Sequence, residues 1–460
     1  MALRYVSSRG AAPTLEFADV LLAGLATDGG LYVPEAWPAL DVADDAERYT
    51  DIAVDVMFPF VDGSLTRDEL AAMVVDAYAT FDTPEVTPLV DLGDGLHLLE
   101  LFHGPTLAFK DVALQLVGRL FDHELARRGE RVTIVGATSG DTGSAAIEAL
   151  RDRDAIDVVI LHPKGRVSEV QRRLMTCVDS PNIHNVAIDG TFDDCQDLVK
   201  VMFADAPFRE RQQLSAVNSI NFARVMAQTV YYVVAHRRLG GGPVSFAVPT
   251  GNFGNVYSGF GAMRMGVPTR RLVIGSNSND ILTRFLETGT MAIQEVHATL
   301  SPAMDIQVSS NLERLLFELI GHDGARIAEL MAQFRGEGTV TFPTELLGAV
   351  SESFCGSRWT DEQTIAEMRA THDSTGLVID PHTAVGLAAA RSAPRDPGVP
   401  LVVLATAHPA KFPDAVEEAI GVRPELPAHL ADLFDRPERV DELPNDLAAV
   451  QAYVAAATGR

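Results

Sequence analysis

The chain has 460 residues, of which 47% are hydrophobic and 22% charged, as in an ordinary soluble globular protein. Its formal net charge of −26 argues against a nucleic-acid partner, because binding a polyanion needs a basic surface. Cys177, Cys195 and Cys355 are far apart and form no C-x-x-C pair, which excludes a disulfide framework and a zinc knuckle. Because we find no secretory pattern and no apolar run of membrane-spanning length, we expect a cytoplasmic protein without a membrane partner. We also expect no bound metal.

The first 90 or so residues are predicted to be mainly helical, with turns at residues 28–30 and 62–63. Thr66 followed by Glu69 predicts a capping box ahead of a helix that ends near Tyr78. Asp94-Gly95 then lies between two short apolar stretches, which is typical of a β-hairpin turn.

Strands and helices alternate over the rest of the chain. The predicted strands are 131–136, 156–161, 183–188, 244–248, 272–274 and 401–404. The predicted helices are 144–150, 192–203 and a leucine-rich helix at 312–319 that Gly321 ends. This alternation predicts an α/β fold with parallel sheets covered on both faces, and ligands in such sheets bind beyond the carboxyl ends of the strands.

The turn after strand 131–136 reads ATSGDTGS and opens a helix, so its free amides favour an anion. Thr138, Ser139 and Thr142 add hydroxyl donors, more than a helix cap alone requires. A tight strand-to-helix turn with a good cap is the alternative. Asp141 would repel a phosphate, so we expect its carboxylate to face another group.

A second turn of this kind, PTGNFGN, follows strand 244–248. Its glycines and asparagines suit a nest of backbone amides that binds an anion. Neither turn matches a Walker motif or the G-x-G-x-x-G fingerprint, and G-x-S-x-G and H-E-x-x-H are absent. A nucleoside triphosphate, a nicotinamide cofactor and a metalloprotease site therefore have little support.

Lys110 lies in HGPTLAFKD with apolar residues on both sides. Burial lowers the pKa of a lysine, and a neutral amine can attack an aldehyde. The alternative is a lysine at a helix start that extends to solvent and pairs with Asp111.

Taken together, these blocks resemble the threonine synthases with a long N-terminal region, whose lysine segment reads close to FHGPTxAFKD. GLATDGGLYVPE, GATSGDTGSA, PTGNFGN and LATAHPAKF are similar to further blocks of that family, as is LPND near the C-terminus. The similarity runs from about residue 5 to about residue 454. The glycine loops alone would indicate only the wider superfamily of fold-type-II pyridoxal-phosphate enzymes.

The resemblance implies a tryptophan-synthase-β-like fold with two parallel-sheet lobes and an N-terminal, mainly helical domain. It implies domains at 1–90, 91–425, with a small lobe at about 117–240 inserted in the large one, and a helical C-terminal tail at 426–460. The implied cofactor is pyridoxal 5'-phosphate, bound as a Schiff base on Lys110. Asp141 is implied to contact the hydroxyl group of the cofactor, and Thr406 is implied to bind its pyridine nitrogen. The other residues implied to bind the cofactor are Gly251, Asn252, Phe253, Gly254 and Asn255.

The implied reaction converts O-phospho-L-homoserine and water into L-threonine and phosphate, the last step of threonine biosynthesis. Thr138, Ser139, Thr142, Asn218 and Arg224 are implied to bind the substrate phosphate. A bidentate guanidinium suits that role, although a helix arginine on the surface is the alternative for Arg224. For Thr406 the alternative is a helix cap ahead of Pro409.

Three other activities remain open at this point. A phospholyase or a serine/threonine dehydratase of the same fold needs the same lysine and cofactor loop. Asn218 and Arg224 argue against the dehydratase, which has no side-chain phosphate to bind, but not against a phospholyase that releases 2-oxobutyrate. Lys110 and Thr406 argue against a non-catalytic protein that binds a phosphorylated metabolite. The sequence does not distinguish a monomer from a homodimer.

Overall fold

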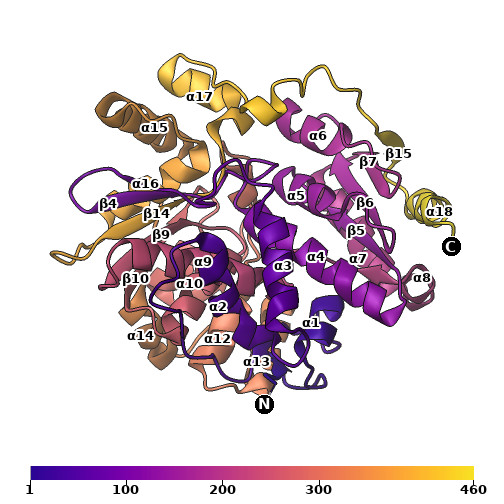
Figure 1. Ribbon diagram of the computed structural model, residues 1–460, viewed down its shortest axis with the longest axis horizontal. Helices are drawn as coiled ribbons and strands as arrows, with labels where there is room; N and C mark the ends of the chain where they lie inside the picture. The colour runs from indigo at the N-terminus through magenta and orange to yellow at the C-terminus, as the bar shows by residue number, and fades with distance from the viewer. Residues whose placement is uncertain (1) are drawn as a thin grey trace.

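The computed structural model describes residues 2–460 and contains two main β-sheets surrounded by helices (Figure 1). The larger sheet has the strand order β13-β10-β9-β14-β4-β3, and its neighbours are parallel except for the β3–β4 hairpin. That hairpin turns at Asp94 and Gly95, both with positive φ, as the sequence predicts. Its strands are β3 (Leu89–Asp91), β4 (Leu96–Glu100), β9 (Val244–Pro249), β10 (Thr269–Ser276), β13 (Phe354–Arg358) and β14 (Leu401–Ala405).

The second sheet has five parallel strands in the order β15-β7-β6-β5-β8. They are β5 (Val132–Ala137), β6 (Ile156–Pro163), β7 (Ile183–Asp189), β8 (Leu214–Ser215) and β15 (Asp441–Pro444). Strand β15 comes from the C-terminal segment, for which the sequence indicated only helix. It is short, and three of its four residues are exposed, so it lacks the apolar alternation that predicts a strand.

The N-terminal region is mainly helical, as predicted, with one antiparallel strand pair. The capping box at Thr66 and Glu69 is confirmed, since each side chain bonds the backbone amide of the other residue. The elements are β1 (Tyr5–Ser7), α1 (Phe17–Ala23), β2 (Tyr32–Pro34), α2 (Tyr49–Val61) and α3 (Arg67–Tyr78).

Helices cover both sheets and fill the space between them (Figure 1). Around the second sheet lie α4 (Lys110–Arg128), α5 (Asp141–Leu150), α6 (Glu169–Thr176), α7 (Phe192–Ala204), α8 (Ala206–Gln212) and α18 (Leu447–Thr458). Around the larger sheet lie α9 (Phe222–Arg238), α10 (Gly254–Met265), α11 (Ile281–Thr288), α14 (Thr344–Ser353), α15 (Asp361–Thr375), α16 (Pro381–Ser392) and α17 (Pro413–Ile420). The remaining elements are α12 (Leu312–Leu319), α13 (Gly324–Glu337), the strand pair β11 (Thr290–Ala292) and β12 (Thr339–Thr341), and the short 3-10 helices η1 (Pro302–Met304), η2 (Pro409–Lys411) and η3 (Ala428–Leu430).

An aromatic cluster joins the N-terminal region to helix α9. Phe222, the first residue of α9, is fully buried, and its ring centroid lies 5.2 Å from that of Tyr5 and 5.9 Å from that of Phe60. Large buried rings contribute strongly to a core, so this cluster fixes the start of α9. It thereby fixes the position of Arg224, two residues along the helix. Within residues 2–460, no helix is both long and apolar enough to cross a membrane.

Candidate active site

Three neighbouring strands of the larger sheet end close together, and the segments that follow them meet. The segment after β4 and the segment after β14 are paired by their backbones. Phe109 N donates to Thr406 O at 2.9 Å, and His408 N donates to Leu107 O at 3.1 Å. Strand β9 lies on the other side of β14 and leads into residues 250–253. The carboxyl ends of these strands therefore gather Lys110, Thr406 and the PTGNFGN loop, where such folds bind ligands.

Lys110 is the first residue of α4, and its side chain is buried. Burial lowers the pKa of its ammonium group, while the nearby Asp141 carboxylate opposes that effect. Lys110 Nζ lies 3.1 Å from Asp141 Oδ2. The alternative of a solvent-directed lysine paired with Asp111 is wrong, because Asp111 instead accepts hydrogen bonds from Thr106 N at 2.8 Å and Thr106 Oγ1 at 2.6 Å.

Asp141 links the two sheets. It is the first residue of α5, which follows β5 of the second sheet, and it pairs with Lys110, which follows β4 of the larger sheet. Its other oxygen, Oδ1, lies 2.7 Å from Lys411 Nζ and accepts from Gln171 Nε2 at 2.9 Å. Burial raises the pKa of Asp141, but the charges of Lys110 and Lys411 hold it well below the usual range. Sequence reasoning missed Lys411 and Gln171 as site residues. The HPAKF block contains Lys411, but nothing in its spacing predicts the contact.

The turn after β5 partly serves as a helix cap. Thr138 Oγ1 accepts from Gly140 N at 3.0 Å and from Gly143 N at 2.9 Å, so this hydroxyl satisfies two amides at the start of α5. Ser139 and Thr142 are half-buried, and their hydroxyls have no hydrogen-bond partner within residues 2–460. The capping alternative thus describes Thr138, whereas the other two hydroxyls stay available to a ligand.

In the PTGNFGN turn, two carbonyl groups are held by hydrogen bonds from later segments, whereas the amides stay free within residues 2–460. Gly251 O accepts from Ser309 Oγ at 2.7 Å, and Asn252 O accepts from Asn311 N at 3.1 Å. Phe253 has a positive φ of 61°, which turns the chain into α10. The amides of residues 251–255 have no partner in the described part of the chain. Such a run of free amides at a helix start is a nest for an anion.

The packing at Gly251 and the hydrogen bonds of Asn255 further define this turn. A Cβ atom on Gly251 would lie 3.0 Å from Ala303 O and Met304 Cα, so a side chain has no room there. Asn255 Oδ1 accepts from the hydroxyls of Tyr231 at 2.6 Å and Tyr232 at 2.9 Å. The Asn255 Nδ2 group is buried, and no residue from 2 to 460 accepts from it. The amide nitrogen is therefore left for a ligand.

Arg224 is buried, which excludes the alternative of a surface arginine. Its Nη1 donates to Val217 O at 3.3 Å, but its Nε is buried without a partner among residues 2–460, and no carboxylate there pairs with it. Burial lowers the pKa of Arg224 to about 10, so it keeps its charge at neutral pH, and that charge contributes to the lowered pKa of Lys110. A buried, unpaired guanidinium beside a lysine is poised for an anion. Asn218 lies in the preceding turn and is exposed; its Oδ1 accepts from Ile220 N.

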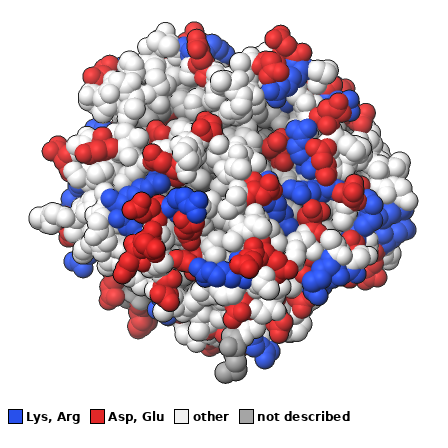
Figure 2. Space-filling view, viewed as in Figure 1, with Lys and Arg blue, Asp and Glu red and all other residues white. Residues whose placement is uncertain are grey.

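Thr406 follows β14 directly and is buried, and its hydroxyl has no protein partner within residues 2–460. The helix-cap alternative for Thr406 is wrong, because His408 caps η2 by accepting from Ala410 N at 3.1 Å. Lys164 lies outside the site. It is exposed and pairs with Glu442 of β15 at 2.6 Å. Figure 2 shows such basic side chains interspersed with acidic ones over one face of the molecule.

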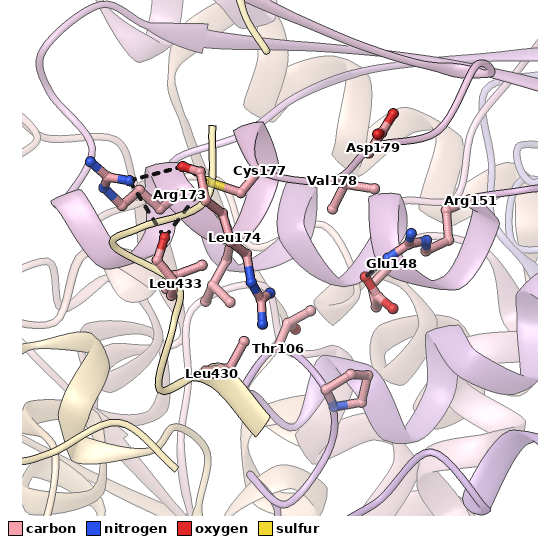
Figure 3. Close-up of a pocket in the computed structure, with 12 residues that line it drawn as sticks. Thr106, Glu148, Arg151, Arg173, Leu174, Cys177, Val178, Asp179, Leu430 and Leu433 are labelled. Carbon is pink, nitrogen blue, oxygen red and sulfur yellow. Dashed lines mark hydrogen bonds and ion pairs between the residues drawn. The ribbon is translucent and has the colours of Figure 1, made fainter. Parts of the chain in front are cut away.

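A separate cavity of about 240 Å³ lies between α5, α6 and the C-terminal segment (Figure 3). Its wall includes Pro105 and Thr106, from the turn that leads into Lys110, but Lys110 does not line it. Its three arginines already have carboxylate partners: Arg151 with Asp152, Arg173 with Glu169 and Arg436 with Asp432. Hence this cavity offers a ligand less free charge than Arg224 does.

Comparison with known proteins agrees with this geometry. Family models for the threonine synthase N terminus, for pyridoxal-phosphate dependent enzymes and for the threonine synthase C-terminal region match residues 4–78, 81–333 and 383–454. A threonine synthase from Pseudomonas aeruginosa is 52% identical over 459 residues, with 98% of each chain covered. The chain belongs to the threonine synthase family.

Solved threonine synthase structures share the whole fold. A PLP-bound threonine synthase from Brucella melitensis is 49% identical and superposes with a TM-score of 0.97 over 100% of both chains. The yeast threonine synthase is 37% identical, with a TM-score of 0.93 over 99% of both chains. The fold is therefore that of a fold-type-II pyridoxal-phosphate enzyme, and the cofactor is pyridoxal 5'-phosphate, both as the sequence analysis expected.

Proposed function

We propose that Lys110 carries the cofactor and that the chain converts O-phospho-L-homoserine and water into L-threonine and phosphate. The observation that carries this proposal is the pairing of two anion-binding features with one buried lysine. The free amides of the PTGNFGN loop form one feature, and the unpaired guanidinium of Arg224 forms the other. A cofactor phosphate and a substrate phosphate need two such places, one for each.

The residues around Lys110 fit the cofactor. In our proposal the amides of residues 251–255 and the orphaned Asn255 Nδ2 hold its phosphate, where Gly251 leaves no room for a side chain. The free Thr406 hydroxyl would bind the pyridine nitrogen. Asp141, whose Oδ2 lies 3.1 Å from Lys110 Nζ, would interact with the cofactor hydroxyl.

The substrate phosphate is proposed to bind on the side of the second sheet. Arg224 supplies its charge and its free Nε, and Ser139 and Thr142 supply hydroxyl donors. Thr138 contributes mainly by holding the turn, and Asn218 reaches the phosphate from the rim of the site. These contacts orient the substrate so that its Cα faces Lys110.

The bound cofactor supplies an electron sink for the negative charge that develops on the substrate. Lys110 Nζ takes the proton from the substrate Cα and then moves a proton at Cβ, and burial, which lowers the pKa of Lys110, favours the neutral amine that this role requires. Arg224 stabilises the phosphate as it leaves from Cγ, because a leaving dianion gains charge-assisted hydrogen bonds there. A proton is then returned to Cγ to form the methyl group, the hydroxyl of water adds at Cβ while its proton passes to the released phosphate, and a proton is returned to Cα to complete threonine.

Product identification tests this function directly. Purified protein with pyridoxal 5'-phosphate is incubated with O-phospho-L-homoserine, and the products are followed by proton and phosphorus NMR. We expect threonine and phosphate in equal amounts, and neither with the Lys110→Ala variant. Accumulation of 2-oxobutyrate in place of threonine would instead indicate a phospholyase.

We further propose that the chain works in the cytoplasm, which its free cysteines at 177, 195 and 355 support. We also propose a division into residues 1–90, 91–425 and 426–460, with an inserted lobe at about 117–240. In support of the inserted lobe, β5–β8 lie together in the second sheet, which β15 of the C-terminal segment joins at one edge. Limited proteolysis tests these boundaries, since cuts should concentrate in the turns on either side of β3 and near residue 425.

A further inference from the structure

A second buried lysine, Lys411, lies beside Lys110, and the proposed reaction does not use it. Its side chain is fully buried at the end of η2. Its Nζ donates to Thr106 O at 2.8 Å and lies 2.7 Å from Asp141 Oδ1. Removing an ammonium group from water is costly unless it is paired and hydrogen-bonded, so these two contacts are what keep Lys411 in place.

Lys411 and Lys110 each contact one oxygen of the Asp141 carboxylate. Asp141 Oδ2 faces Lys110 at 3.1 Å, while Oδ1 faces Lys411 and accepts from Gln171 Nε2 at 2.9 Å. The Thr106 carbonyl on the other side of Lys411 belongs to the turn that leads into Lys110, and Asp111 holds that turn. Lys411 therefore ties the carboxylate and the lysine turn into one rigid unit.

The charges explain what this unit does. Lys110 must lose its proton before it can bind an aldehyde or take a proton from the substrate. With Lys110 neutral, the charges of Asp141 and Lys411 cancel. Without Lys411, a neutral Lys110 would leave Asp141 as a buried carboxylate with no cation bonded to it. That state is unfavourable, so Lys110 would keep its proton.

Other charged groups face this cluster without replacing Lys411. Arg224 lowers the pKa of Lys110 from one side, and His382, which is bonded to Asp380 at 2.7 Å, lowers that of Asp141 from another. Asp111 faces Lys411 through the Thr106 turn. Among residues 2–460, however, the side chains that contact the Asp141 carboxylate within hydrogen-bond distance are Lys110, Lys411 and Gln171.

We propose that Lys411 is a positioning residue for Lys110: it holds and neutralises Asp141, so that the carboxylate fixes the Lys110 amine without keeping a proton on it. This proposal rests on the proposed function, in which Lys110 carries the cofactor. It assigns a role in the chemistry to a residue that itself forms no bond to substrate or cofactor.

The test measures how fast cofactor-free protein binds pyridoxal 5'-phosphate covalently, as a function of pH. Absorbance follows attachment, and the pH of half-maximal rate reports when Lys110 loses its proton. Lys411→Met removes the charge, and the double variant Asp141→Asn/Lys411→Met removes both charges. Lys164→Met is the matched control, because Lys164 is an exposed lysine paired with Glu442.

Lys411→Met is expected to move the half-maximal pH upward by about 1–3 pH units, because the Asp141 carboxylate, 3.1 Å from Lys110 Nζ, then acts on Lys110 without a compensating cation, and to slow attachment at neutral pH by about tenfold or more. The double variant is expected to return toward the wild-type midpoint, and Lys164→Met to leave it unchanged. An unmoved midpoint in Lys411→Met, or a double variant as impaired as the single one, would overturn the proposal.

The folding of the variants also bears on the role of Lys411. If Lys411→Met does not fold, the double variant should still fold with the wild-type midpoint, because it removes the Asp141 carboxylate together with its Lys411 partner. A double variant that also fails to fold would make Lys411 purely structural and refute its positioning role. Borohydride reduction and peptide mapping of the wild type separate this result from the proposed function. Label on a lysine other than Lys110 contradicts the proposed function, whatever the Lys411 variants do.

Discussion

Arg224 provides the sharpest test of the proposed substrate site. It is buried at 4% exposure with Nη1 on the Val217 carbonyl, which leaves its Nε–Nη2 edge for a ligand. A phosphate bound there gains up to two charge-assisted hydrogen bonds, each contributing about 1.5–3 kcal/mol. Since water replaces part of that gain in a variant, we expect Arg224→Ala to lose about 1.5–4 kcal/mol of transition-state stabilisation. That loss corresponds to a roughly tenfold to thousandfold fall in kcat/KM.

The assay is steady-state release of phosphate from O-phospho-L-homoserine. Arg224→Lys should recover only part of the loss, because an ammonium group lacks the planar fork. Arg270→Ala is the control. Arg270 is exposed, pairs with Asp396 and should leave kcat/KM unchanged.

The free energy of unfolding tests the role of Arg224 independently of activity. Burying a guanidinium without a carboxylate partner carries a desolvation cost, which the hydrogen bond from Arg224 Nη1 to Val217 O at 3.3 Å offsets only in part. Arg224→Met should therefore leave the free energy of unfolding unchanged or raise it, while kcat/KM falls. Chemical denaturation measures this difference. If Arg224→Met weakened cofactor binding but kept kcat/KM for the substrate at saturating cofactor, Arg224 would belong to the cofactor phosphate and our assignment of the two sites would be reversed.

Three other predictions concern the rest of the site and its surroundings. Lys110→Ala should abolish turnover but keep the thermal midpoint near that of the wild type, because Asp141 retains Lys411 as its partner; a variant with residual turnover above about 1% would contradict the role of Lys110. Gly251→Ala should weaken cofactor retention in dialysis, since its Cβ would lie 3.0 Å from Ala303 O, and normal retention would mean that this loop holds something else. Burial lowers the pKa of His103, but its contacts with Glu100 and Asp82 outweigh burial and raise it above 6.5. The stability that His103 contributes is then complete below pH 6.5 and is lost as the pH rises through the raised pKa. The His103→Gln variant should therefore lose more unfolding free energy at about pH 5.5 than at about pH 9. An equal loss at both pH values would refute this.

The parallel strands and both glycine loops could be predicted from the sequence because their signals are local. A β-branched run followed by glycines and hydroxyls marks β5 and its turn, and Val244–Pro249 with PTGNFGN does the same for β9. The prediction for β10 was too short at its start. Arg270 and Arg271 interrupt the apolar run there, and the pairing with β9 shifts register between Thr269 and Arg271.

What the sequence could not supply were contacts between distant segments. Lys411 reaches Asp141 from 270 positions along the chain, and Ser309 and Asn311 orient the carbonyl groups of a loop more than 50 residues before them. Such partners have no spacing rule, since tertiary packing alone brings them together. The same limit explains the wrong alternative for Lys110, because its neighbour Asp111 was the carboxylate visible in the sequence and Asp141 was the one in space.

The central claim is that Lys110 carries the cofactor. The most direct measurement reduces the cofactor-loaded protein with sodium borohydride and maps the pyridoxyl group by peptide mass spectrometry. We predict a single labelled lysine, Lys110, with Lys411 unlabelled because Thr106 and Asp141 hold its ammonium group. Label on Lys411 or Lys164, with Lys110 unmodified, would contradict the account.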